Sequence, residues 1–207
     1  MTADLVVLVP DKDIEQAICG LLERCQSLGI RRPSVAAIVV HPNRDPGVFH
    51  TGHELIRPYV GAARFALIIF DRAWAGAPST DAEALSTQVE GRCRRGWGDH
   101  AKCVCIDPEV ENWVWSDSPH VATALGWPDR SELLCWLRSH GLWPTDAAKP
   151  PDPKAAFEAA VREKKIVPSS SIFGKLARNV GLDHCHDPAF LRLRSILHSW
   201  FPLAPAS

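Results

Sequence analysis

The chain has 207 residues, of which 46% are hydrophobic and 23% charged, and its formal net charge is −1. This composition fits one folded domain of ordinary size, with or without a small appendage, and excludes a disordered chain or a wholly basic nucleic-acid coat. No apolar run approaches the ~20 residues of a membrane span, and the first residues lack the basic start of a signal peptide. We therefore expect a cytoplasmic protein without a membrane partner.

Strands and helices are predicted to alternate in the front two-thirds of the chain. Short apolar runs rich in β-branched residues predict buried strands at 5–9, 35–40, 65–70 and 101–106. Apolar residues at helical spacing predict helices at about 11–26, 53–63 and 81–95, and turn-rich composition predicts a loop at 41–47. This alternation is typical of βαβ units, so we predict an α/β fold with a mostly parallel sheet flanked by helices.

After residue 109 the sequence pattern predicts helices alone. They are expected at 109–115, 118–125, 131–140, 154–164, 170–180 and 188–200. The proline-rich residues 146–153 are typical of a linker. We therefore divide the chain into an α/β domain of residues 1–145, this linker, and a small helical C-terminal region of residues 154–207.

The charge is divided unevenly between these parts. Residues 149–207 contain nine Lys and Arg residues and five acids, a net of +4, which leaves a net of −5 for residues 1–148. An acidic front part is thus followed by a basic back part. The near-neutral total charge does not by itself exclude contact with nucleic acid.

Acidic residues follow each predicted strand. They are Asp11 after the first strand, Asp45 after the second, Asp71 after the third, and Asp107, Glu109 and Glu111 after the fourth. The carboxyl ends of parallel strands meet at one sheet edge, and carboxylate oxygens suit Mg²⁺. Helix capping is the ordinary alternative for Asp11 and Asp107, whereas Asp71 directly ends an apolar strand.

Several segments resemble the TOPRIM-like proteins of bacterial defence loci, most closely a component of the methylation-associated anti-phage defence system. They are LVVLVPDKD (5–13), VHPNRDPG (40–47), IIFDRAWAG (68–76), IDPEVENWVWSDSPH (106–120), DPAFLRLRSIL (187–197) and WFP (200–202). The resemblance implies a TOPRIM-like sheet in residues 1–145 and a role in anti-phage defence together with other subunits of the system. It also implies a Mg²⁺-dependent nuclease site, with catalytic residues Asp11, Asp71, Glu109 and Glu111.

Within that resemblance, Asp71, Glu109 and Glu111 are the expected metal ligands, and Asp11, Asp107 and Asp45 are weaker candidates. The sequence departs from the family pattern at two places. The pattern has a glutamate at the end of the first strand, where this chain has Pro10 followed by Asp11. It also has Asp-x-Asp after the third strand, where this chain has Asp71, Arg72 and Ala73.

Two hypotheses follow for the carboxylate edge. If the site is a Mg²⁺-dependent nuclease, the carboxylates of Asp71, Glu109, Glu111 and Asp11 should converge within a few ångströms and be open to solvent. If the chain is a non-catalytic sensor or scaffold that binds other proteins, we expect an exposed apolar patch containing tryptophan and a site blocked by Arg72.

The basic residues of the C-terminal region have two possible roles. Arg162, Lys164, Lys165, Lys175 and Arg178 could contact the phosphates of DNA or RNA, or dock on an acidic partner subunit. No glycine-rich phosphate-binding loop is present, so no nucleotide cofactor is expected.

Other candidate ligands give weaker patterns. His50 and His53 have a spacing that two ligands of a transition metal can use on a helix. Cys103 and Cys105 alternate within a predicted strand, which suits packing as well as zinc, and His184 stands near Cys185 without a second ligand pair. The seven cysteines are expected to be reduced, and most of the eight tryptophans are expected to be core residues.

Overall fold

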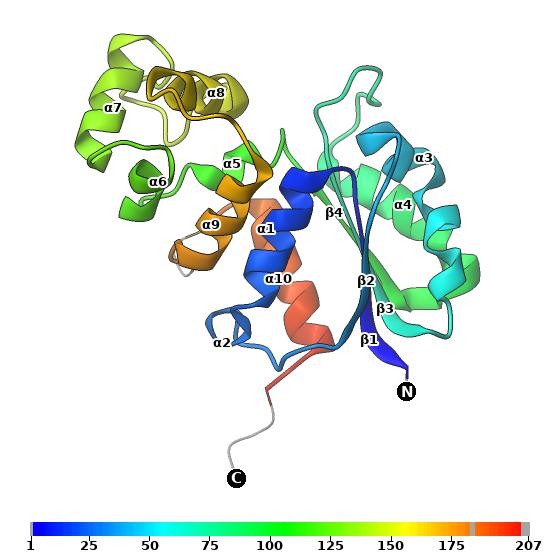
Figure 1. The fold of residues 1–207 in the computed structure, drawn as a ribbon. Coiled ribbons are helices and arrows are strands. Elements are labelled where there is room, and N and C mark those ends of the chain that lie inside the picture. The colour runs from blue at the N-terminus through cyan, green and yellow to red at the C-terminus, as the bar shows by residue number, and fades with distance from the viewer. Residues whose placement is uncertain (1, 183–184, 204–207) are drawn as a thin grey trace.

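A four-stranded parallel sheet forms the centre of the computed structural model, which describes residues 2–182 and 185–203. The strands are β1 (Ala3–Val9), β2 (Val35–Val40), β3 (Ala63–Asp71) and β4 (Ala101–Ile106). Their spatial order is β2-β1-β3-β4, so β1 and β3 are central. The predicted α/β fold with a mostly parallel sheet is confirmed, and each strand lies at its predicted place (Figure 1).

Alternation of side chains along the strands divides the interior into two cores. In β1, Leu5, Val7 and Val9 face one core, whereas Val6 and Leu8 face the other. All five side chains are fully buried. A strand whose two faces are both covered needs apolar residues at every position, which explains the continuous apolar runs.

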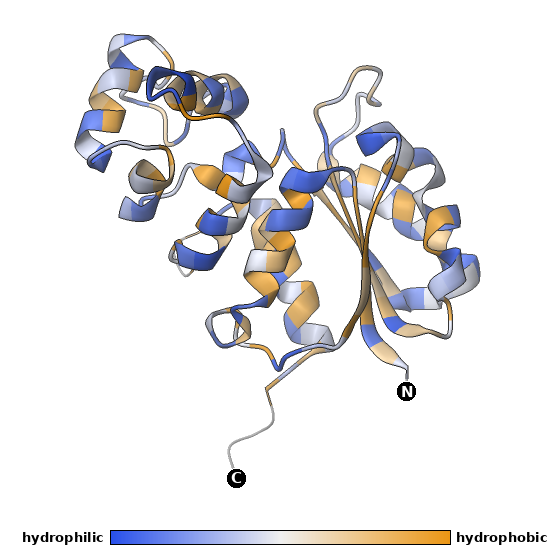
Figure 2. Ribbon diagram, in the orientation of Figure 1, coloured by the Kyte–Doolittle hydropathy of each residue, from blue (hydrophilic) through white to orange (hydrophobic). Residues whose placement is uncertain are grey.

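Helices cover both faces of the sheet. One face packs against α1 (Lys12–Leu22), the short α2 (Cys25–Leu28), α9 (Ser170–Asn179) and α10 (Pro188–Trp200). The other face packs against α3 (Arg44–Leu55) and α4 (Ala82–Trp97), which are followed by the 3-10 turns η1 (Arg57–Tyr59) and η2 (Gly98–His100). The apolar sides of these helices face the sheet (Figure 2).

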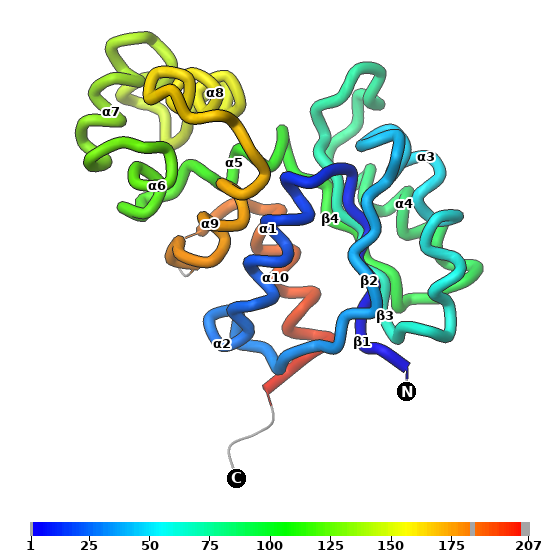
Figure 3. The backbone as a smooth tube through the Cα atoms, in the orientation of Figure 1, coloured from blue at the N-terminus to red at the C-terminus, as the bar shows by residue number. Residues whose placement is uncertain are grey.

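The C-terminal helices share the core of the sheet although they are distant in sequence. α9 lies alongside α1, and α10 lies against β4 (Figure 3). Close approach of α1 and α9 requires small residues: a Cβ atom on Gly20 would lie 2.8 Å from both the Cβ of Ala177 and the carbonyl oxygen of Gly174. A larger residue at Gly20 would therefore push the two helices apart.

The remaining helices form a lobe beside the sheet (Figure 1). They are α5 (Glu111–Val114), α6 (Pro119–Ala124), α7 (Arg130–Ser139) and α8 (Pro153–Glu163). The helices predicted after residue 109 are thus confirmed among the described residues. Residues 146–152, within the predicted linker, contain neither helix nor strand. The division at this linker into residues 1–145 and 154–207 remains a prediction.

The prediction for residues 41–63 was wrong. A loop was expected at 41–47 and a helix at 53–63, but α3 already begins at Arg44 and ends at Leu55. Pro46 is accommodated because it occupies the first turn of the helix, where backbone N–H groups have no partner within the helix. The later proline, Pro58, lies in η1, and β3 begins at Ala63.

All eight tryptophans lie in the described part of the chain, and none is exposed. Trp97, Trp115, Trp127 and Trp143 are buried, which confirms the expectation of core residues. The exposed tryptophan patch expected for a scaffold is therefore not seen in the structure. Within the described residues, no helix has both the length and the hydropathy needed to cross a membrane.

The side chain of Asp187 links α10 to the lobe. Replacing it is expected to lower the stability of the fold. Its buried carboxylate accepts hydrogen bonds from the first turn of α10, from Trp113 Nε1 (2.9 Å) and from Asn112 Nδ2 (2.7 Å). Asp187→Ala is expected to lower the free energy of unfolding by about 3 kcal/mol, because a helix cap and two buried hydrogen bonds are lost together.

The matched control is Asp129→Ala, which removes the exposed N-cap of α7. This change is expected to cost about 1 kcal/mol, the ordinary contribution of a cap. Urea denaturation of the two variants measures the difference. Equal losses would mean that the contacts of Asp187 with Trp113 and Asn112 add nothing.

Candidate metal centre

Asp71 is the last residue of β3, at the carboxyl edge of the sheet. The strand pairs with β1 on one side and β4 on the other, which fixes its end. The backbone N–H of Asp71 also donates to Asp45 Oδ1 at 2.8 Å. Asp45 therefore holds the strand end that carries the Asp71 carboxylate.

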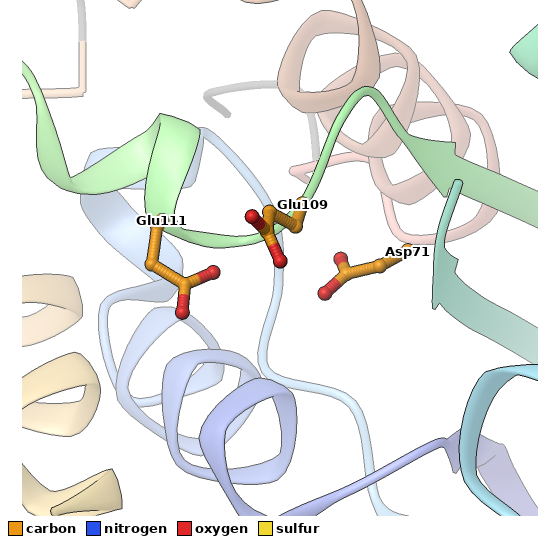
Figure 4. A group of neighbouring side chains, drawn as sticks. All are labelled: Asp71, Glu109 and Glu111. Carbon is orange, nitrogen blue, oxygen red and sulfur yellow. The ribbon is translucent and has the colours of Figure 1, made fainter. Parts of the chain in front are cut away.

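Glu109 and Glu111 come from the segment that follows β4. Glu109 lies in the connecting loop, and Glu111 is the first residue of α5. One carboxylate oxygen each from Asp71, Glu109 and Glu111 lie within 4.8 Å of one another. Figure 4 shows the three side chains directed toward a common space. The prediction that Asp71, Glu109, Glu111 and Asp11 converge is confirmed for the first three, whereas Asp11 is not part of the group.

The three carboxylates are more buried than expected. Asp71 is 8% exposed and Glu111 is 5% exposed, so the expectation of a site open to solvent was wrong. Near Glu111, residues of α8 and α9 lie over this edge and line the adjacent cavity. Asp71 Oδ1 and Glu111 Oε2 are buried without a hydrogen-bond partner. Buried oxygens of this kind are costly unless a proton or a cation satisfies them.

Burial shifts the protonation of these groups. Burial, and then the nearby carboxylates of Asp45 and Glu111, raise the pKa of Asp71 well above its ordinary value. Burial likewise raises the pKa of Glu111 to about 7, although Lys154 acts in the opposite direction. Both acids therefore hold protons more tightly than usual, and a divalent cation would have to displace those protons in order to bind.

Lys154, near the start of α8, lies against the same carboxylates. Its Nζ is 3.0 Å from Glu109 Oε2 and 3.7 Å from Glu111 Oε1. Burial lowers the pKa of Lys154, but Glu111 and Glu109 outweigh burial and leave the pKa above its ordinary value. The ammonium group of Lys154 thus neutralises two of the three candidate ligands, as a bound metal ion would.

The weaker metal candidates lie around this cluster and do not belong to it. Asp11 caps α1, accepting from the backbone N–H groups of Asp13 and Ile14. Asp107 pairs with Arg72 at 3.3 Å and is half exposed. Asp45 supports Asp71 through the backbone contact described above. Among the described residues, Asp71, Glu109 and Glu111 form the one group with metal-ligand geometry.

Arg72 does not block the cluster. Its Nε donates to the carbonyl oxygen of Thr80 at 3.1 Å, and its guanidinium pairs with Asp107. The blocked site expected for a non-catalytic scaffold is therefore not produced by this residue. Lys154 is the cation that lies at the carboxylates instead.

A polar cavity of about 320 Å³ adjoins Glu111. It is lined by residues in the first turns of four helices: Lys12 of α1, Arg44 of α3, Lys154 of α8 and Ser170 of α9. The three basic side chains are matched by three acids, so the positive contribution beyond charge balance comes from the partial charge of the helix N-termini. The acids lining the cavity are Asp13, Glu111 and Glu158.

Sequence reasoning missed Lys12, Arg44 and the contact made by Lys154. A usable signal existed, since each of these basic residues stands in the first turn of a helix. Basic residues are unfavourable at that end of a helix dipole. Their presence there indicates nearby acids or a bound anion.

The predicted basic contact residues divide into two groups. Arg178 forms a bidentate ion pair with Glu23, and Lys164 pairs with Glu132 and lies over the ring of Trp127. The remaining residues are exposed: Arg162, Lys165 and Lys175. No contact with nucleic acid or with a partner is established for any of them.

The histidine and cysteine candidates gather no metal ligands in the described part of the chain. His41 is buried and bonds to Thr51, and burial lowers its pKa. Cys103 and Cys105 pack in the core beneath α4, where burial raises the pKa of both thiols. The described cysteines form no disulfide. His184 lies outside the described residues.

The donor set indicates which metals the site would favour. Three carboxylates, two of them with unpaired buried oxygens, match the oxygen ligands that Mg²⁺ or Mn²⁺ takes. Comparisons with protein-family models, with curated proteins and with solved structures found no match. The geometry of the site is therefore the structural basis for a function.

Proposed function

We propose that the chain is a Mg²⁺- or Mn²⁺-dependent nuclease and a component of a bacterial anti-phage defence system, acting with partner subunits. The observation that carries the nuclease proposal is the convergence of Asp71, Glu109 and Glu111 with two buried, unpaired oxygens. The defence role rests on the sequence resemblance to TOPRIM-like proteins of defence loci.

In this proposal the three carboxylates hold the metal, and Asp45 fixes the end of the strand that carries Asp71. A bound divalent cation would activate water and neutralise charge on a phosphodiester. The cavity beside Glu111 would take the substrate backbone, with Arg44 and Lys12 facing its phosphates. Lys154, once released from Glu109 and Glu111, could neutralise a phosphate at the boundary between metal and substrate.

A non-catalytic sensor or scaffold is the second candidate, and one observation favours it. Lys154 already compensates Glu109 and Glu111, so the cluster could serve as an ion-pair network that docks α8 onto the sheet edge. In that case the chain would bind other proteins without cleaving nucleic acid. Metal-dependent cleavage separates the two candidates, because a purely structural network cleaves no nucleic acid whether or not a cation binds.

The test is cleavage of single- and double-stranded DNA and RNA by the purified chain, alone and with the products of neighbouring genes. We expect cleavage with Mg²⁺ or Mn²⁺ and none with a chelator. Arg44→Gln is expected to raise the KM about tenfold, because a charge-assisted phosphate contact is lost, while Mn²⁺ affinity stays unchanged.

Arg138→Gln provides the matched control, since Arg138 is exposed on α7 and does not line the cavity. This variant is expected to keep the wild-type KM. Binding of Mn²⁺ without cleavage of any substrate would favour the scaffold over the nuclease. Cleavage that persists in chelator would contradict the metal-dependent mechanism.

A further inference from the structure

A second cavity lies at the opposite edge of the sheet from the carboxylates. It has a volume of about 420 Å³ and is formed where α3 with η1 and α4 end. These helices run antiparallel to the strands, so their C-terminal ends lie at the amino edge of the sheet (Figure 1). The volume is within the range of small-molecule sites.

Two polar atoms on residues lining this cavity are buried without a hydrogen-bond partner. They are Trp97 Nε1 and His53 Nδ1. Trp97 is 7% exposed, so its indole N–H has lost water without gaining an acceptor. An unpaired buried donor costs roughly 1–3 kcal/mol, and native proteins seldom carry one without a partner. Trp97 lines the cavity, so an acceptor on a bound ligand would satisfy this N–H once the cavity wall shifts to admit it.

The charge around the cavity is positive. Arg57, Arg92 and Arg95 line it, against one carboxylate, that of Glu54. Three full positive charges exceed Glu54 together with the partial negative charge, about half a unit each, of two helix C-termini. Arg92 is held by the carbonyl oxygen of Phe49 and by the Phe49 ring.

The guanidinium groups of Arg57 and Arg95 have no carboxylate partner among the described residues. By contrast, Arg94, the neighbour of Arg95 on α4, pairs with Asp99 and does not line the cavity. Arginine recognises phosphate through paired N–H donors. Two arginines without a carboxylate partner therefore favour a phosphoryl group as the occupant of the cavity.

We propose that this cavity binds a small phosphate ester of nucleotide size. Arg57 and Arg95 would hold its phosphate, and the indole N–H of Trp97 would donate to an acceptor elsewhere on the ligand. Val60, Cys93 and the Trp97 ring give the cavity an apolar side suited to a base. Inorganic phosphate alone is much smaller than the cavity. The proposal is independent of the metal centre.

The experiment is calorimetric titration of the full chain with AMP, GMP, CMP and UMP, with inorganic phosphate and adenosine as further probes. A chelator is present throughout, so that metal bound at the carboxylates does not contribute. We expect one site for at least one nucleotide, with affinity at least tenfold above those for phosphate and adenosine. The indole N–H resonance of Trp97, assigned from Trp97→Phe, should shift on binding.

The variants locate the site. Arg57→Gln combined with Arg95→Gln is expected to weaken binding at least tenfold, because two charge-assisted contacts are lost. Arg94→Gln is the matched control and should bind as the wild type does. Trp97→Phe should weaken binding several-fold, because the donor that it removes would be lost to the ligand; since Trp97 is a core residue, circular dichroism and the unfolding temperature check that the variant is folded.

Three results would overturn the proposal. The first is that no nucleotide binds at millimolar concentration, and the second is that phosphate binds as tightly as the nucleotides do. The third is undiminished binding by the Arg57 and Arg95 double variant. Loss of binding in Arg44→Gln instead would place the nucleotide in the cavity beside Glu111. None of these results bears on metal-dependent cleavage, which is tested separately.

Discussion

If the chain is the proposed nuclease, Asp71→Ala is expected to lower Mg²⁺-dependent cleavage by at least about 100-fold, since a buried candidate ligand at the carboxylate edge is lost. Mn²⁺ binding, followed by calorimetry, should weaken in parallel. Loss of both properties together would tie the activity to the metal and not to a change in substrate contacts. Far-UV circular dichroism and the unfolding temperature check that the variant is folded.

Asp107→Ala is the matched control for Asp71→Ala. Asp107 follows β4 at the same sheet edge, but it pairs with Arg72 and is not part of the metal-ligand group. Its replacement is expected to change cleavage by less than about threefold, as is usual for an exposed ion pair. Equal degradation of nucleic acid by wild type and Asp71→Ala would contradict the nuclease proposal.

Glu111→Gln is expected to stabilise the metal-free protein at pH 8. The pKa of Glu111 is raised from 4.5 to about 7, so the folded state binds a proton that the unfolded state has released between these values. Stability therefore falls as the pH rises through this window, by about 3 kcal/mol in all, and stays low above it. Glutamine carries no charge and avoids this loss.

The expected gain at pH 8 corresponds to a rise of roughly 5–10 °C in unfolding temperature, shrinking to nothing near pH 4. Scanning calorimetry in chelator across this pH range measures it. Glu163→Gln, an exposed change at the end of α8, should shift the unfolding temperature by less than about 2 °C. A lower stability for Glu111→Gln at pH 8 would show that its ion pair with Lys154 outweighs the cost of burying the charge.

The strands could be predicted because a strand that is buried on both faces has an uninterrupted run of apolar residues. Residues 65–70 are apolar throughout, and the strand found there extends from Ala63 to Asp71. The start of α3 could not be predicted in the same way, because Pro46 and Gly47 suggest a turn. Gly47 is required there for a tertiary reason: a Cβ atom would lie 2.1 Å from His41 Nδ1.

The acidic residues of the candidate site could be predicted from the sequence, but the packing of side chains and helices around them could not. Asp71, Glu109 and Glu111 follow strands, and the parallel topology brings such residues to one edge. The helices α8 and α9, which lie over Glu111, could be predicted from their apolar periodicity, but a local pattern does not say where a helix docks. Lys154 is 45 residues from its partner Glu109, so its role depended on how the lobe packs.

The position of Lys154 makes the lobe and the metal competitors for the same negative charge. Lys154 neutralises Glu109 and Glu111. The proposed metal would neutralise the same two carboxylates, so by reciprocal linkage each would weaken the binding of the other. Loading of metal at the sheet edge would loosen the start of α8, and amide hydrogens in its first turns would exchange faster. A partner that bound α8 and displaced Lys154 from the carboxylates would, by the same linkage, raise the affinity for metal. The chain could in this way remain unloaded at ordinary Mg²⁺ concentrations until another subunit engages the lobe.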